Sequence, residues 1–262
     1  MKVTVLGCGG SGGVPLIGGE DGRGDWGACD PATVQNRRTR SSILLQGSDG
    51  ATILVDTGPD LRAQLLTAGV RRVDAILLTH AHADHIMGLD EVRQLNRIMG
   101  RALPIYATQD TLNTVTHRFD YAFRPETQGF FRPALLARPV EPGQVVDMAG
   151  LPVRIFSQDH RVMETLGLRV GGFGYSTDVV TMPDAGFAAL EGVRTWMVGC
   201  FQRRPHPVHA DVATVERWAR RLRPNRTVLT HMGPDLDWGW MRTWLPAGLE
   251  PAHDGMVLEV QR

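Results

Sequence analysis

The chain has 262 residues, with 28 basic and 28 acidic side chains, so its formal net charge at pH 7 is zero. This balance gives no overall field that would attract nucleic acid or an anionic membrane, and we expect neither as a partner. The hydrophobic content of 42% excludes a disordered or fibrous chain. No apolar stretch approaches the roughly 18 residues of a membrane span. Three cysteines without a CxxC pair predict no disulfide framework and favour a cytoplasmic location.

Short apolar runs separated by turn residues predict strands, and apolar residues at helical spacing predict helices. Both types continue to the end of the chain without a linker or repeat, so we interpret residues 1–262 as one α/β domain. The long segments 14–37 and 121–140 are interpreted as active-site loops. The predicted strands cover 3–6, 42–45, 52–55, 75–78, 195–198 and 227–229, with several short ones between 140 and 179; the predicted helices cover 89–98, 111–122 and 211–222.

The strongest chemical signal is the run His-Ala-His-Ala-Asp-His at 80–85, directly after the apolar strand 75–78. Imidazole and carboxylate groups suit zinc, iron and manganese. Alternation along the chain places His80, His82 and Asp84 on one side, and His85 follows on the turn. Four ligands in six residues are too many for one ion that also needs ligands from elsewhere. The run therefore predicts two ions.

Further ligands are expected where other short β-like runs end. His160, Asp178 and His231 each follow such a run. Any one of them alone could be an ordinary polar residue of the surface or the core. Their common placement at strand ends, together with the run at 80–85, predicts that they converge on one cleft.

These motifs, with Asp178 in GYSTDV and His231 in LTH, resemble the metallo-β-lactamase superfamily over nearly the whole chain. The resemblance implies an αββα four-layer sandwich, in which two sheets face each other and helices lie outside. It also implies two divalent metal ions, Zn or Mn. Asp56, in LVDTG, resembles the strand-end aspartate that orients the ligand loop, although a simple loop cap is the alternative. The implied ligands are His80, His82 and His160 for one ion, Asp84, His85 and His231 for the other, and Asp178 as the bridge.

The resemblance also indicates which branch of the superfamily the chain is most similar to. β-Lactam hydrolases of this superfamily usually carry Cys in the place of Asp178, so an aspartate favours the phosphodiesterase, glyoxalase and lactonase branches. The opening loop LGCGGSGGVP, the basic segment NRRTRSS at 36–42 and the late LTHMG resemble the phosphoribosyl cyclic phosphodiesterases. Ser11, Arg38 and Arg40 are therefore candidate contacts for a substrate phosphate. Ion pairs along a solvated strand edge are the alternative interpretation of the arginines.

A phosphodiesterase also needs a proton for its leaving oxygen, and histidine is the usual source. His209, in PVHAD, resembles the residue that supplies this acid in the phosphodiesterase branch; His206 is the alternative, and helix capping is another. Members of the phosphonate pathway carry an additional structural zinc on clustered cysteines and a later histidine. Where those members have clustered cysteines, this chain has only Cys29, and where they have the later histidine, it has Pro234. We therefore expect no structural zinc.

We therefore hypothesise a binuclear metal-dependent phosphodiesterase that hydrolyses a small cyclic phosphate or nucleotide-like ester through metal-bound hydroxide. Its catalytic residues would be Asp84, Asp178 and the general acid His209. A transfer-RNA 3′-processing nuclease is an alternative, but it needs an RNA-gripping extension or basic patch that the sequence does not show. A metalloprotein like that of pyrroloquinoline quinone biosynthesis and a lactonase are further alternatives. The sequence leaves open the metal identity and whether the chain forms a homodimer.

Overall fold

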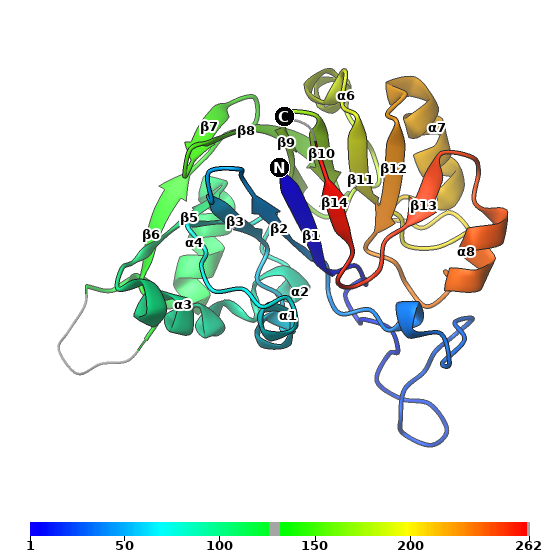
Figure 1. The fold of residues 1–262 in the computed structure, drawn as a ribbon, viewed down its shortest axis with the longest axis horizontal. Coiled ribbons are helices and arrows are strands. Elements are labelled where there is room, and N and C mark those ends of the chain that lie inside the picture. Colours follow the sequence, from blue (N-terminus) through cyan, green and yellow to red (C-terminus); the bar gives the residue numbers. More distant parts are fainter. Residues whose placement is uncertain (126–131, 261–262) are drawn as a thin grey trace.

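The computed structural model describes residues 1–125 and 132–260, which form two seven-stranded sheets with helices on the outside (Figure 1). The first sheet has the order β14-β1-β2-β3-β4-β5-β6, and the second has the order β13-β12-β11-β10-β9-β8-β7. The αββα sandwich predicted above is confirmed. The strands are β1 Lys2–Gly7, β2 Ser42–Gln46, β3 Thr52–Val55, β4 Ala75–Leu77, β5 Leu103–Ala107, β6 Leu135–Pro139, β7 Val145–Met148, β8 Leu151–Asp159, β9 Glu164–Val170, β10 Phe173–Ser176, β11 Thr195–Gly199, β12 Arg226–Thr230, β13 Leu249–Pro251 and β14 Val257–Glu259.

Helices cover the outer face of each sheet. Apolar side chains of α1 to α5 share one buried cluster with the first sheet, and α6 to α8 pack against the second. Within the described residues, no helix is both long and apolar enough to cross a membrane. The helices are α1 Leu61–Thr67, α2 Ala83–Ile86, α3 Val92–Met99, α4 Gln109–Arg118, α5 Asp120–Phe123, α6 Asp184–Leu190, α7 Val212–Leu222 and α8 Trp238–Trp244, with short 3₁₀ turns at Val34–Asn36 and Leu89–Glu91.

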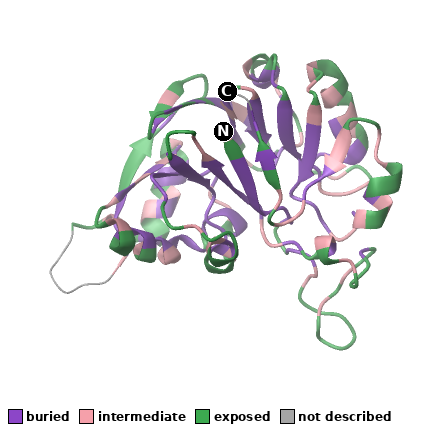
Figure 2. Ribbon diagram, viewed as in Figure 1, coloured by how far each residue is buried: buried purple, intermediate pink, exposed green. Residues whose placement is uncertain are grey.

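Strand β2 shows why the sheet sequences read as continuous apolar runs. Ile43 and Leu45 belong to the cluster between the two sheets, whereas Leu44 belongs to the cluster under the helices. Successive side chains of a strand point to opposite faces, and here both faces are covered. The buried centre of the molecule therefore includes the strands of both sheets (Figure 2).

The structure changes some predicted elements. The helix predicted over 89–98 begins as a 3₁₀ turn and becomes α3, which ends at Gly100 with a left-handed φ of 63° that glycine adopts without strain. The helix predicted over 111–122 is broken at Phe119, whose ψ of 41° is not helical. Interpreting 121–140 as a loop was wrong at both ends, because α5 continues to Phe123 and β6 covers Leu135–Pro139. Residues 126–131 of that segment lie outside the described part.

The largest fully buried side chain gives a test of the packing. Trp196 of β11 is 0% exposed, and its Nε1 donates a hydrogen bond to Ser176 Oγ at 3.1 Å. Trp196→Ala should lower the free energy of unfolding by about 3–5 kcal/mol, because it leaves a cavity in a close-packed core. Trp244→Ala, at a side chain that is 68% exposed, is the control and should change it by less than about 0.5 kcal/mol. Urea denaturation of the metal-free variants measures both, and equal losses would contradict the predicted packing.

Candidate metal centre

Ligand-type side chains gather where strands of both sheets end. Asp56 follows β3, Asp178 follows β10 and His231 follows β12. All three have left-handed backbone conformations, with φ of 64°, 49° and 53°, which non-glycine residues adopt rarely. Such strained residues persist where the surrounding structure holds them, and they concentrate at functional sites. Here they turn the chain sharply as it leaves each strand.

The run at 80–85 reaches the same place by a route that differs from the prediction. The chain is extended only to His82, whose ψ of 152° precedes the first residue of α2, Ala83. The alternation argument was therefore wrong for Asp84, because a helical turn and not an extended chain positions it. The same turn brings His85 beside it, with 3.2 Å between His85 Nε2 and Asp84 Oδ2.

The seven predicted ligands come together in two groups, and a third group joins Asp178 and His231 with His209. Within each group, the ligating atoms lie within 4.8 Å of one another: His80, His82, His160 and Asp178 form the first, and Asp84, His85 and His231 form the second. Asp178 lies between the groups. Its Oδ1 is 3.7 Å from Nε2 of His160 in the first group. In the second group, Nε2 of His85 is 3.1 Å from Oδ2 of Asp178, and Nε2 of His231 is 3.3 Å from Oδ1.

Three of the histidines are oriented through Nδ1, which leaves Nε2 directed at the cluster. Nδ1 of His80 lies 3.0 Å from the hydroxyl of Thr79, and Nδ1 of His160 lies 2.7 Å from the carbonyl oxygen of Val208. Nδ1 of His85 lies 2.7 Å from a carboxylate oxygen of Asp56. Metal-ligating histidines are usually held in this way by their second nitrogen. Nε2 of His80 is buried and has no hydrogen-bond partner among the described residues, as expected of an atom that binds a metal ion.

Asp56 organises two ligands at once. Its fully buried carboxylate accepts the backbone N–H and the hydroxyl of Thr79, at 2.8 Å each, besides contacting His85. Because the Thr79 hydroxyl donates to Asp56, it accepts from Nδ1 of His80, so the carboxylate acts on His80 through Thr79. The sequence interpretation did not include Thr79, although its position directly before His80 at the end of a strand is visible in the sequence.

The electrostatics of the cluster keep its carboxylates ionised. Burial opposes charge on Asp178 and Asp84. The neighbouring His85 and His231 nevertheless hold the pKa of each carboxyl below its usual range. Burial and the neighbouring His85 lower the pKa of His80 well below its usual range, so this imidazole is neutral and free to bind a metal. Buried carboxylates that stay ionised need compensating positive charge. The donor set of imidazole and carboxylate fits zinc or manganese.

His209 lies beside this cluster, on the loop before α7. Its Nδ1 is 3.8 Å from Asp178 Oδ1, and its ring centroid is 4.9 Å from that of His231 and 4.7 Å from that of His160. His206, the alternative acid, is one ring further out, with its centroid 5.1 Å from that of His209. The geometry favours His209 over His206 as the group that reaches a molecule held at the cluster.

The three candidate phosphate contacts are placed differently from one another. Arg38 is buried, and its guanidinium donates hydrogen bonds to the carbonyl oxygens of Gly233 and Leu236, so it ties loops together inside the protein. Arg40 forms an ion pair with Asp60 at 3.2 Å and donates to the carbonyl oxygen of Ser11. Ser11 itself is exposed. Arg38 therefore has contacts inside the protein, whereas Arg40 and Ser11 lie at the surface, where the phosphate contact stays a prediction.

The two segments that correspond to the structural-zinc site of the phosphonate-pathway members, around Cys29 and Pro234, are in contact. Cys29 Sγ lies 3.4 Å from the carbonyl oxygen of Pro234 and donates a hydrogen bond to it. The backbone N–H of Ala28 donates to the same oxygen at 2.9 Å. The 14–37 segment is thus fastened to the loop after His231 by hydrogen bonds between protein atoms.

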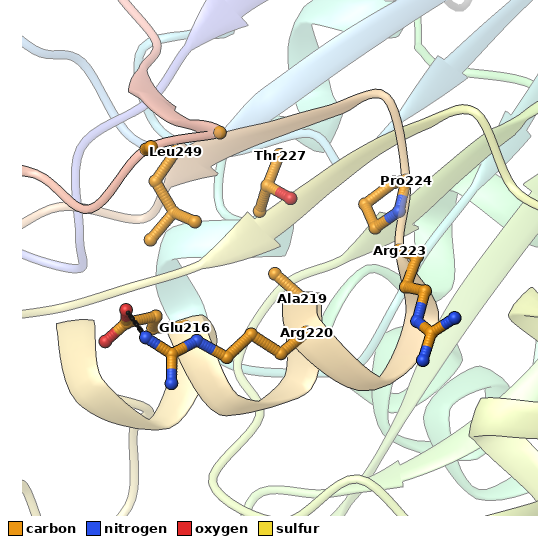
Figure 3. Close-up of a pocket in the computed structure, with 9 residues that line it drawn as sticks. Glu216, Ala219, Arg220, Arg223, Pro224, Thr227 and Leu249 are labelled. Carbon is orange, nitrogen blue, oxygen red and sulfur yellow. Dashed lines mark hydrogen bonds and ion pairs between the residues drawn. The ribbon is translucent and has the colours of Figure 1, made fainter.

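A separate cavity of about 430 Å³ lies between α7 and strands β12 and β13 (Figure 3). Its charged lining includes Glu216 and Arg220, which form an ion pair with each other at 2.6 Å. None of the cluster residues described above lines this cavity. The chemistry-bearing side chains gather at the strand ends instead.

Comparison with known proteins agrees with this geometry. Residues 51–232, more than half of the chain, match the model of the beta-lactamase superfamily domain. The crystal structure of a new diphosphatase from the PhnP family is 35% identical, with a TM-score of 0.89, and the similarity covers 99% of this chain and 98% of that one.

Two further relatives have different names. An octanoyltransferase of Porphyromonas gingivalis is 32% identical over 235 residues, 88% of this chain, but the chain spans only 46% of that protein's length. A ribonuclease Z of Mycobacterium avium is 27% identical over 248 residues, which cover 83% of this chain and 88% of that protein. The domain match and the diphosphatase similarity confirm the resemblance inferred from the motifs. The chain belongs to the metallo-β-lactamase superfamily.

Proposed function

We propose that this protein is a binuclear metal-dependent phosphoesterase that cleaves a P–O bond in a small phosphodiester or diphosphate. The observation that carries the proposal is the position of Asp178 between two groups of ligands, with His209 3.8 Å away. One ion would be held by His80, His82 and His160, and the second by Asp84, His85 and His231, with Asp178 shared between them. When bound, two such ions ionise a shared water and neutralise charge that develops on phosphoryl oxygens.

The protein's own residues supply the rest. Asp56 and Thr79 keep the ligand imidazoles in one orientation, which reduces the reorganisation needed during the reaction. His209 stands where it can pass a proton to the leaving oxygen. Burial and the neighbouring His231 lower the pKa of His209 to about 3, with Asp178 opposing, so the ring is neutral before substrate binds. An anionic phosphoryl group close to the ring favours the imidazolium form, so the acid role requires that His209 take up its proton when the substrate binds.

The substrate class follows from charge and from the relatives. The net charge of zero supplies no general attraction for RNA, which favours a small substrate. The diphosphatase relative extends the candidates from cyclic phosphodiesters to diphosphates. The similarity to ribonuclease Z makes cleavage of a precursor transfer RNA the second candidate.

An assay of the metal-loaded protein on a cyclic nucleotide, a dinucleoside diphosphate, bis-p-nitrophenyl phosphate and a precursor transfer RNA tests the proposal. We expect the small substrates to be turned over and the RNA to be left intact. Hydrolysis of the RNA alone, with an affinity that falls steeply as salt rises, would replace the proposal with the nuclease.

His209→Ala tests the acid role. It should lower kcat on the cyclic nucleotide, which expels a poor alkoxide leaving group, by about 10²- to 10⁴-fold. The loss should be less than about tenfold on bis-p-nitrophenyl phosphate, because nitrophenolate leaves without a proton. His117→Ala is the matched control, since that histidine is exposed at the end of α4. Equal losses of kcat on the two substrates would remove His209 from the acid role.

A further inference from the structure

Phe201 lies in a slot between two glycines that belong to distant loops. A Cβ added to Gly10 would come within 2.8 Å of the Phe201 ring, and one added to Gly233 would come within 3.2 Å of it. Real Cβ atoms essentially never approach as closely as 2.8 Å, so Gly10 accepts no side chain while the ring stays in place, and a side chain at Gly233 would require the ring to shift by a few tenths of an ångström. Gly10 belongs to the glycine-rich opening loop, whose glycines the proposed chemistry does not use, and Gly233 comes two residues after the ligand His231.

The ring of Phe201 in turn supports the ring of His209. Their centroids are 4.9 Å apart and their planes differ by 25°, which is a stacked arrangement. The backbone N–H of Phe201 donates to the carbonyl oxygen of Ala210 at 3.0 Å, and the N–H of Gly233 donates to the carbonyl oxygen of Phe201 at 2.9 Å. Phe201 is therefore fastened on one side to the residue that follows His209 and on the other to the loop of His231.

His209 depends on such support because no hydrogen bond orients its ring within residues 1–125 and 132–260. His80, His85 and His160 are each held through Nδ1. For His209 the structure records ring contacts and an approach of 3.8 Å to Asp178, which is too long for a hydrogen bond.

We infer that Phe201 is a positioning residue that holds the imidazole of His209 toward the leaving-group side of the metal centre, and that Gly10 and Gly233 provide the space for it. This inference rests on the proposed function, because its consequence for catalysis is transmitted through His209. In this interpretation, Gly10 of the opening loop leaves space for the Phe201 ring and does not serve to bind phosphate. A misplacement of about 1 Å in a reacting group can cost about 100-fold in rate.

Phe201→Leu keeps an apolar side chain but removes the stacking ring. On the cyclic nucleotide it should lower kcat by about 10- to 100-fold with little change in KM, and on bis-p-nitrophenyl phosphate it should change kcat by less than about threefold. In a His209→Ala background the same substitution should have almost no further effect, because the two residues act as a unit. Gly10→Ala should reproduce the selective loss, since its methyl group displaces the ring. Phe187→Leu is the matched control in α6, where the ring packs on Arg221 and not on a histidine.

A crystal structure of Phe201→Leu supplies a readout that does not depend on activity. The inference predicts that the His209 ring rotates or becomes disordered while His80, His85 and His160 keep their positions. The inference would be overturned if the His209 ring did not move in Phe201→Leu. It would also be overturned if Phe201→Leu lowered kcat equally on both substrates and this loss added to that of His209→Ala. If His209→Ala alone affects both substrates equally and yet His209 moves in the Phe201→Leu structure, the acid role fails and the positioning by Phe201 stands.

Discussion

Replacing Asp178 with alanine should reduce the bound metal from about two ions to one or none per chain and bring hydrolysis down to background. Its carboxylate oxygens lie within 4 Å of ligating nitrogens from both groups, His160 in one and His85 and His231 in the other. Without it, neither ion has a shared ligand, and the buried imidazoles of His85 and His231 lose the negative charge beside them. The effect should therefore exceed that of removing any single histidine.

Elemental analysis after metal loading, together with the phosphodiester assay, measures both parts of this prediction. Asp184→Ala is the matched control, because that aspartate lies in the exposed first turn of α6 and pairs with Arg221. It should keep both the metal content and the rate. An Asp178→Ala protein that still binds two ions with unchanged affinity would contradict the bridging assignment.

Asp56→Asn should weaken metal affinity by about 10- to 100-fold, although Asp56 is not itself a ligand. Asparagine tolerates the left-handed φ of 64° at this position, so the backbone can stay as it is. The amide carries no charge and has one acceptor oxygen, so it cannot serve both Thr79 and His85 as the carboxylate does. The imidazoles of His85 and His80 would then lose their fixed orientation.

Titration with a competing chelator measures this affinity. Asp74→Asn is the matched control: this aspartate is similarly buried, and it pairs with Arg72 and Arg101 away from the ligands. It should lower the free energy of unfolding and leave metal affinity unchanged. An affinity for metal that does not fall in Asp56→Asn would show that the carboxylate is only a loop cap, which was the alternative drawn from the sequence.

The convergence of the ligands could be predicted from the sequence because strand ends are readable from short apolar runs. His160, Asp178 and His231 each follow such a run. Strands β10 and β12, which precede Asp178 and His231, are both parallel to β11, so their carboxyl ends meet at one edge of the sheet. Strand β8, which precedes His160, runs in the same direction because one antiparallel strand, β9, separates it from β10. The local path at Asp84 could not be predicted, because four residues of helix, Ala83–Ile86, are too short to leave a periodic signal.

The contacts around the site could be predicted less well from the sequence. An arginine in a basic segment gives no sign of whether it faces solvent, and Arg38 is buried because carbonyl groups from the loop after His231 surround it. The contact between Gly10 and Phe201 joins residues 191 positions apart in the sequence, so no local pattern records it. Tertiary contacts of this kind decide the role of a residue after its chemical type has been recognised.

The proposed function requires one metal ion on each side of Asp178. Anomalous diffraction from crystals of the metal-loaded protein, recorded at the absorption edge of the bound metal, tests it most directly. We expect two anomalous peaks, one among His80, His82 and His160 and one among Asp84, His85 and His231, with the Asp178 carboxylate between them. A single peak, or peaks away from these side chains, would contradict it.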